Sequence, residues 1–212
     1  MSVFISFEGV DGSGKSTQIQ LLLQYLDERG VPYVFTREPG GTPIAEQIRR
    51  ILLDPANREM SVITEALLFA AGRADHVSRI IRPALEAGKV VICDRFVDSS
   101  LVYQGAAGGL PIEFLVSINQ MATGALRPHR TILLDVDPEV GLARLGGADR
   151  IEGKSLEYHR LVREAYLELA RSEPRRVKVV DASRSVEEVQ KDIRRLVEEV
   201  LPRRFRAAGT TV

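Results

Sequence analysis

The stretch Gly9-Val10-Asp11-Gly12-Ser13-Gly14-Lys15-Ser16 decides the fold of this chain. It matches the pattern G-x-x-x-x-G-K-[ST] without a mismatch, and it lies between a predicted strand at residues 3–7 and apolar residues at helical spacing. Glycines in such a loop let backbone N–H groups surround a phosphate, and the start of the following helix adds partial positive charge. We therefore predict that this phosphate loop, together with Thr17, binds a nucleoside triphosphate. Lys15 would reach the β and γ oxygens, and the Ser16 hydroxyl would ligate Mg²⁺.

Outward from this loop, short apolar runs alternate with stretches of helical periodicity. We predict further strands at 33–36, 90–94, 130–136 and 177–181. Helices are predicted to begin after Thr42, at about Ser155 and, through a capping box, at Ser185. Between 61 and 87 we expect two helices broken near Gly72. Residues 96–111 are predicted to form functional loops and the start of a helix that continues to Ala122.

This alternation predicts an α/β protein with a three-layer P-loop NTPase fold, in which a five-stranded parallel sheet is flanked by helices. We expect one domain over residues 1–212, because the length suffices for one sizeable core. Ligands of such sheets bind beyond the carboxyl ends of the strands. The functional loops should therefore follow the first four strands.

Composition excludes several classes of protein. The 29 Lys and Arg residues balance 29 Asp and Glu residues, so the formal charge of zero argues against general nucleic-acid binding. The single cysteine, Cys93, favours a reducing, cytoplasmic setting. No apolar stretch approaches the ~20 residues that span a bilayer, so we predict no membrane insertion. The basic residues Arg203, Arg204 and Arg206 fall in a tail at 203–212 that we expect to be solvated and frayed.

Two arginines follow predicted strands, where the fold places ligands. Arg37 lies in TREPGGT and Arg95 in DRF. A guanidinium binds phosphate in a bidentate manner, so the pair indicates a second phosphate facing the first. Asp94 resembles the Walker B carboxylate and is predicted, with Ser16, to support Mg²⁺.

Transfer to such a second phosphate needs no general base. The second pKa of a phosphate monoester is near 6, so the acceptor is already largely an anionic nucleophile at neutral pH. We therefore interpret His76, His129 and His159 as structural or solvent-facing residues.

Together, the motifs EGVDGSGKST, FTREPGGT, LLFAAGR, DRFVDSSLVYQG, LLDVDPEVGLARL and DRIE resemble the bacterial thymidylate kinases, from Val3 to about Ala182. The resemblance implies transfer of the γ-phosphoryl group of ATP to dTMP with Mg²⁺, giving dTDP and ADP for dTTP supply. It also implies the P-loop nucleoside monophosphate kinase fold and a homodimer.

The resemblance further implies roles for individual residues. Asp11 would accept a hydrogen bond from the deoxyribose 3′-hydroxyl, and Arg95 and Arg37 would bind the acceptor phosphate. The thymidine side would be completed by five residues: Phe69 stacking on thymine, Arg73 donating to a base carbonyl, Ser100 at the base edge, Tyr103 under the sugar, and Gln104 as a weaker candidate. From the residues alone, Phe69 would be a core aromatic and Arg73 a surface arginine, although their i,i+4 spacing places them on one helical face.

In this family an arginine from the phosphate loop or from a mobile lid neutralises the transferring group. Gly12 offers no side chain at the loop position, so the charge must come from the lid segment, residues 144–154. Arg150 is our first choice as the catalytic arginine and Arg144 the second, with Gly146 and Gly147 as a hinge. The loop at 181–184 is a candidate for contact with adenine.

Two alternatives remain open at this stage. The chain could be another nucleoside monophosphate kinase, acting on dUMP or a purine nucleotide. It could also be a P-loop switch that binds ATP and regulates a partner, but that function would leave Arg37, Arg95 and the Phe69/Arg73 pair without a role.

Overall fold

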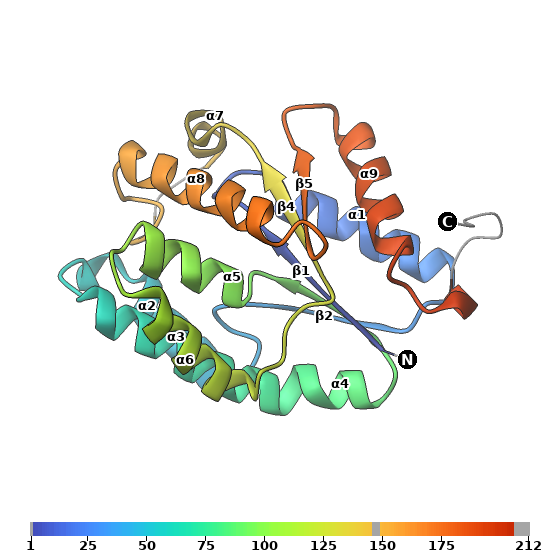
Figure 1. The fold of residues 1–212 in the computed structure, drawn as a ribbon, viewed down its shortest axis with the longest axis horizontal. Coiled ribbons are helices and arrows are strands. Elements are labelled where there is room, and N and C mark those ends of the chain that lie inside the picture. Colours follow the sequence, from blue (N-terminus) through green and yellow to red (C-terminus); the bar gives the residue numbers. More distant parts are fainter. Residues whose placement is uncertain (1, 146–148, 206–212) are drawn as a thin grey trace.

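The computed structural model describes residues 2–145 and 149–205 (Figure 1). Five parallel strands form one sheet in the order β2-β3-β1-β4-β5. The strands are β1 (Val3–Glu8), β2 (Tyr33–Arg37), β3 (Val90–Asp94), β4 (Arg130–Asp135) and β5 (Val177–Asp181). This arrangement confirms the predicted α/β fold, because each predicted strand is present within one or two residues of its expected bounds.

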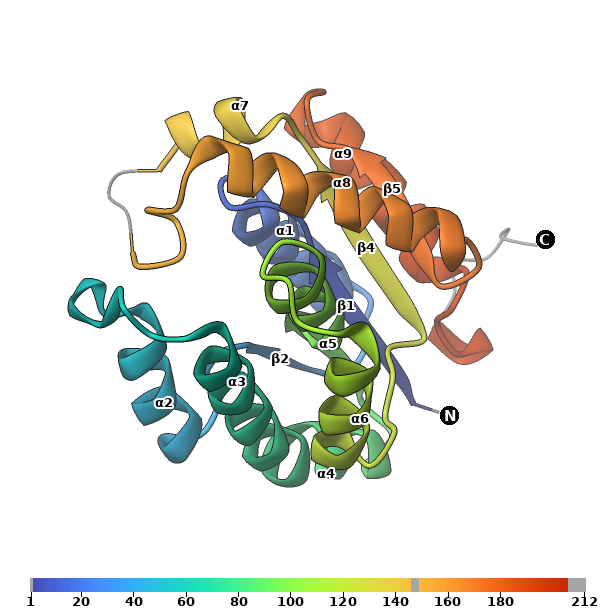
Figure 2. The same ribbon diagram turned by 60° about the vertical axis from the view of Figure 1, so that its left-hand side comes forward.

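Helices cover both faces of the sheet. Helices α1 and α9 lie on one face, and the remaining helices lie mainly on the other (Figures 1 and 2). The α-helices are α1 (Lys15–Glu28), α2 (Pro43–Leu53), α3 (Val62–His76), α4 (Arg82–Glu86), α5 (Val97–Ser100), α6 (Ile112–Thr123), α7 (Pro138–Ala143), α8 (Leu156–Ser172) and α9 (Val186–Glu198). Shorter turns are η1 (Pro55–Asn57), η2 (Val77–Ile81), η3 (Leu101–Ala106) and η4 (Arg203–Phe205), of which η2 and η3 are π-helical.

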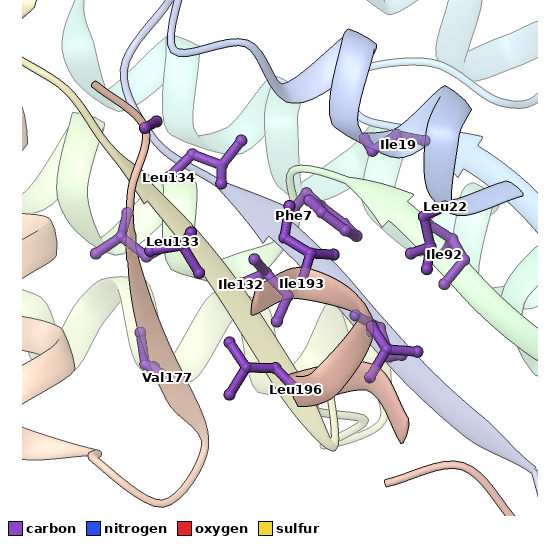
Figure 3. Packing of buried hydrophobic residues seen from close by; sticks show 14 of the residues in the cluster. Phe7, Ile19, Leu22, Ile92, Ile132, Leu133, Leu134, Val177, Ile193 and Leu196 are labelled. Carbon is purple, nitrogen blue, oxygen red and sulfur yellow. The ribbon is translucent and has the colours of Figure 1, made fainter. Parts of the chain in front are cut away.

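The central strand β1 is buried along its whole length, and its side chains alternate between the two faces. Phe7 packs with Ile19 of α1 and Ile193 of α9 (Figure 3). Phe4, on the opposite face, packs with Ile81. Burial of each such side chain stabilises the fold by roughly 1.5–3 kcal/mol. The core therefore fixes the strand whose carboxyl end leads into the phosphate loop.

The predicted helix break near Gly72 is wrong. Helix α3 runs through Gly72 to His76, and the chain stays helical through η2 and α4. A Cβ at Gly72 would lie 3.7 Å from Ile48 and 3.8 Å from Ala45, both on α2. The glycine thus lies where α3 packs on α2, and a small residue at a helix contact is compatible with an unbroken helix.

The predicted loops between residues 96 and 111 are also wrong for most of that stretch. The chain is helical from Val97 to Ala106, and α6 begins only at Ile112. Tertiary contacts explain the difference, because Asp98 is buried and accepts hydrogen bonds from Arg176 and Thr131. The polar residues of this stretch therefore belong to a helical segment with buried hydrogen bonds and not to a loop.

The tail differs from its prediction where it is described. Residues 203–205 form the turn η4, in which Phe205 packs against the core and its carbonyl accepts a hydrogen bond from Arg29. Arg206 and the residues after it lie outside the described part of the chain. No described helix is both long and apolar enough to cross a membrane.

Candidate active site

A cleft of about 620 Å³ opens at the carboxyl edge of the sheet. The strand register creates this edge, since Arg37 of β2 lies opposite Asp94 of β3, and Asp94 lies opposite Phe7 of β1. The cleft is lined by the phosphate loop, the ends of β2 and β3, residues of α3, α5 and η3, and the residues that directly follow α7. The segments singled out in the sequence therefore converge on one cavity.

The phosphate loop turns directly into α1. Gly14 is in the left-handed region at φ 90°, and α1 begins at Lys15 without a side-chain cap among the described residues. Lys15 Nζ donates to the carbonyl oxygens of Gly9 at 3.1 Å and Val10 at 3.0 Å. Burial and the nearby charge of Arg95 lower the pKa of Lys15. An anion in the loop would stabilise this buried ammonium and meet the uncapped amides of α1.

The phosphate loop packs backbone to backbone against α7. A Cβ on Gly12, which has φ 72°, would lie 1.9 Å from the carbonyl oxygen of Gly141. A Cβ on Gly141 would in turn lie 2.5 Å from the carbonyl oxygen of Asp11. This contact excludes a side chain at the loop position, and it brings Arg144 close enough for Nη1 to donate to the Gly12 carbonyl at 3.3 Å.

Arg95 crosses from β3 to the phosphate loop. Its backbone has φ 69°, an uncommon conformation for a residue with a side chain. The guanidinium donates to the Gly9 carbonyl at 3.0 Å and to the Asp11 carboxylate. Although burial alone would lower the pKa of Arg95, the Asp11 charge raises it well above its ordinary value. The same pairing outweighs burial at Asp11 and lowers the pKa of that carboxyl.

Glu8, at the end of β1, holds the segment that carries Arg95. Its carboxylate accepts from the Phe96 amide at 2.8 Å, from Ser99 Oγ at 2.6 Å and from the Tyr166 hydroxyl at 2.8 Å. Burial, followed by repulsion from Asp98, raises the pKa of Glu8 to about 7. The residue after Arg95 is thus anchored directly to the strand beneath it.

Arg37 lines the cleft from β2 and is about half exposed. Its guanidinium donates to both carboxylate oxygens of Glu46, at 3.0 and 3.2 Å. Arg49, which sequence reasoning missed, also lines the cleft and donates to the Pro39 carbonyl at 2.8 Å. Burial and the charge of Arg37 lower the pKa of Arg49. Positive charge therefore gathers on this side of the cleft.

Arg73 is fully buried at the edge of the cleft, and its guanidinium bonds to other residues of the chain. It forms an ion pair with Glu38 at 2.7 Å, and it donates to Ser100 Oγ at 3.0 Å, to the Phe96 carbonyl at 3.2 Å and to the Asn119 side chain. These contacts use all five of its N–H groups. A contact with a base carbonyl would have to replace one of them.

The predicted thymidine side lies on α3, α5 and η3. Phe69 lines the cleft and packs against the core, as does Tyr103. The Tyr103 hydroxyl donates to the Asp11 carboxylate at 3.3 Å. Ser100 and Gln104 also line the cleft, and Gln104 Nε2 donates to Glu65 Oε1 at 2.7 Å. The structure brings these four side chains together around one wall of the cavity.

The lid segment separates the two candidate arginines. Arg144 is exposed and lines the cleft, next to the phosphate loop. Arg150 is buried in an ion pair with Glu65 at 2.6 Å and is absent from the described residues that line the cleft. The structure thus places our second choice, and not our first, in the cleft beside the phosphate loop. The proposed hinge, Gly146 and Gly147, lies outside the described residues.

Comparison with known proteins places the chain in a family. The sequence profile described as thymidylate kinase matches residues 7–193. The chain belongs to the thymidylate kinase family. It is 86% identical over 212 residues to the thymidylate kinase of Symbiobacterium thermophilum, with 99% of each chain covered. It is 52% identical over 202 residues to that of Pelotomaculum thermopropionicum, covering 93% of this chain and 94% of the relative.

A solved structure agrees with this assignment. The crystal structure of thymidylate kinase from Ehrlichia chaffeensis matches with a TM-score of 0.77 at 34% identity, covering 93% of this chain and 98% of that one. As a member of the thymidylate kinase family, the chain is a phosphotransferase, as predicted from its motifs.

Several polar residues of this thymidylate kinase family member were missed by sequence reasoning. Glu8, Glu38 and Glu65 are buried carboxylates that hold Phe96, Arg73 and other groups around the cleft. The one signal available was a charged residue inside an otherwise apolar or periodic stretch, as at Glu8. Which arginine or amide such a carboxylate holds depends on contacts between distant segments.

Proposed function

We propose that the chain transfers the γ-phosphoryl group of ATP to dTMP in this cleft, giving dTDP and ADP. The observation that carries the proposal is the junction of Arg95 with the phosphate loop. Arg95 bonds both Gly9 and Asp11, so a cation suited to an acceptor phosphate lies beside a loop suited to a donor phosphate. Membership of the thymidylate kinase family supports dTMP as the acceptor.

Catalysis would come from position and charge. The acceptor phosphate is largely dianionic at neutral pH and can attack without a general base. Lys15 would meet the β and γ oxygens, and Arg95 and Arg37 would hold the acceptor in line. The triphosphate would lie along residues 9–17, with the loop at Ala182 and Arg184, which lines the same cleft, beside adenine.

We propose Arg144 as the lid cation, in place of Arg150. Its guanidinium is beside Gly12, where the γ-phosphate of a nucleotide bound in the loop would lie. A cation there stabilises negative charge on the transferring group. Arg150 is engaged by Glu65 and would have to abandon a buried ion pair to reach the same place.

Mg²⁺ fits the residues at the loop. Asp94 Oδ1 is buried and without a hydrogen-bond partner in the described part of the chain, and Ser16 lines the same cleft. Mg²⁺ is held in such sites by one or two protein oxygens together with substrate phosphates and waters. We propose that Ser16 and Asp94 hold the ion, which when bound neutralises charge on the β and γ oxygens.

The acceptor nucleoside would occupy the wall formed by α3 and η3. Phe69 offers a ring for stacking on thymine, and Tyr103 packs where it would lie under the sugar. Asp11 would accept from the 3′-hydroxyl, in competition with Arg95 and Tyr103. At the base edge we keep three candidates with polar groups, Arg73, Ser100 and Gln104, all of which line the cleft.

We also propose a homodimer formed through α2, α3 and α6, which lie side by side (Figures 1 and 2). These helices leave large apolar side chains exposed: Ile44, Ile51, Ile63, Leu67, Ile112 and Val116. Exposed apolar surface of this kind marks a protein interface. Sedimentation analysis should show a dimer that Leu67→Glu dissociates, while Leu161→Glu on α8 leaves it intact.

A panel of acceptors tests the activity. ADP formation should be measured with ATP and, in turn, dTMP, dUMP, AMP and GMP. We expect dTMP to give the highest kcat/KM. A preference for AMP or GMP would contradict the thymine assignment, and hydrolysis independent of any acceptor would indicate a nucleotide-dependent switch instead.

A further inference from the structure

Arg150 joins the lid segment to the end of α2. Its Nε donates to the Leu52 carbonyl at 2.6 Å, and its backbone N–H donates to the Leu53 carbonyl at 3.2 Å. Carbonyls in the last turn of a helix lack partners within the helix and carry partial negative charge. Arg150 satisfies two of these carbonyls, one with its guanidinium and one with its backbone N–H, and so fixes the lid segment to α2.

Glu65 of α3 meets the same guanidinium from the other side. The Glu65 side chain is 2% exposed and that of Arg150 is 4% exposed. Glu65 Oε2 accepts from Arg150 at 2.6 Å, and Oε1 accepts from Gln104 Nε2 at 2.7 Å. One buried carboxylate therefore holds a residue of the lid with one oxygen and a residue of the acceptor wall with the other.

The neighbours of Arg150 face the cleft although Arg150 does not. Asp149, Ile151 and Glu152 all line it. The Asp149 carboxylate accepts from the amides of Ile151 and Glu152, at 2.8 and 2.9 Å, so these residues form one compact turn. Fixing Arg150 from behind therefore fixes the part of the turn that faces the nucleotides.

We propose that Glu65 is a positioning residue that joins the lid to the acceptor side of the cleft through Arg150 and Gln104. Glu65 lies behind the cleft lining and acts through these two partners. Occupation of the acceptor wall and placement of the lid turn at 149–154 are then coupled, because both depend on one carboxylate. This inference rests on the proposed function and adds to it a link between the acceptor wall and the lid.

A single substitution at Glu65 or Arg150 would not separate a positioning role from an effect on the stability of the fold. Removing one member of a buried ion pair leaves the other charge unpaired, which is strongly destabilising, whereas replacing both members with neutral groups is often tolerated. The double variant Glu65→Gln/Arg150→Met removes both charges and still allows residue 65 to accept from Gln104. It is therefore the decisive variant, and Glu168→Gln, in an exposed ion pair, is the matched control.

The test compares kcat, the two KM values and the unfolding temperature of wild type, both single variants, the double variant and the control. We expect the double variant to unfold within a few degrees of wild type, with a KM for dTMP raised about tenfold and a KM for ATP within about twofold. The two single effects on the dTMP KM should not add, because both break one link. Should the double variant fail to fold, Arg150→Lys, which keeps the charge and loses the bond geometry, should give the same selective rise.

Two results would overturn the link. One is an unchanged KM for dTMP in a folded double variant. The other is a fall in kcat with both KM values unchanged, which would make Arg150 a direct participant in the transfer. If wild type itself fails to phosphorylate dTMP, the proposed function fails, and this inference fails with it. The wild-type measurement therefore distinguishes the two failures.

Discussion

The phosphate loop and the lid turn lie on the same cleft, but they are held in place by different means. The loop is one contiguous stretch that leads into α1, and its glycines let it adopt this turn and pass close to the backbone of α7. The lid turn is held by partners 98 and 85 residues away, Leu52 and Glu65. A site made of local backbone can be recognised from its motif, whereas a site made of distant side chains becomes visible only in the fold.

The largest effect should come from breaking the phosphate loop. Lys15→Ala should lower kcat by about 10³-fold, because a buried cation against transition-state charge is removed. ADP release measured with saturating dTMP and ATP would show this, with Lys178→Ala, on β5 and outside the described cleft lining, as the control. Turnover close to wild type would remove Lys15 from its proposed role.

The next effect should come from the start of the lid segment. Arg144→Met should lower kcat by about 10²-fold and leave the KM for dTMP within about twofold, since its charge would act mainly in the transition state. Arg160→Met, which alters an exposed arginine on α8, serves as the control. A rise in the KM for dTMP with unchanged kcat would instead place Arg144 in acceptor binding.

A smaller effect should come from separating the loop from α7. Gly141→Ala adds a Cβ where the Asp11 carbonyl lies 2.5 Å away. The helix must shift, so we expect a loss of about 1–3 kcal/mol in the free energy of unfolding and a modest fall in kcat. Denaturant titration measures the first quantity. Val140→Ala, at an exposed position of the same helix, should change little, and equal stability of both variants would contradict the close contact.

The smallest expected effect is the change in the free energy of unfolding per pH unit that comes from Glu8, at the end of β1. The pKa of Glu8 is raised to about 7 by burial first and then by Asp98, so the folded state binds a proton that the unfolded state releases near pH 4.5. Stability should therefore fall as pH rises from about 5 to 7, by at most about 1.4 kcal/mol per unit. The difference in unfolding free energy between wild type and Glu8→Gln measures this contribution, and a flat difference across that range would contradict it.

Most of the fold could be predicted from the sequence because periodicity, caps and the phosphate loop are local. The capping box at Ser185 and the Thr42 cap are both present. The helix break predicted near Gly72 was wrong because the sequence alone does not distinguish a glycine that ends a helix from a glycine at which a second helix packs closely. Residues 97–106 misled the prediction because their polar groups bond to Arg176 and Glu8, which are far away in the chain.

The candidate site divides in the same way. The convergence of Arg37, Asp94 and Arg95 on the cleft follows from their place after parallel strands, which sequence patterns reveal. The choice between Arg144 and Arg150 could not be made that way, since both are basic residues near glycines. Their different partners in the fold are the basis of our proposal of Arg144, because Arg150 pairs with Glu65 and Arg144 bonds the phosphate loop.

At Arg95, the backbone conformation that the fold requires conflicts with the side chain that the proposed acceptor site requires. Its backbone adopts φ 69°, which for a residue with a Cβ carries a strain on the order of 1 kcal/mol. Glycine would relieve that strain and offer no guanidinium. The chain therefore tolerates, at the junction of its two proposed phosphate sites, a residue that the local geometry disfavours. A search for more stable variants would select against the arginine there, and so against the ability to hold an acceptor.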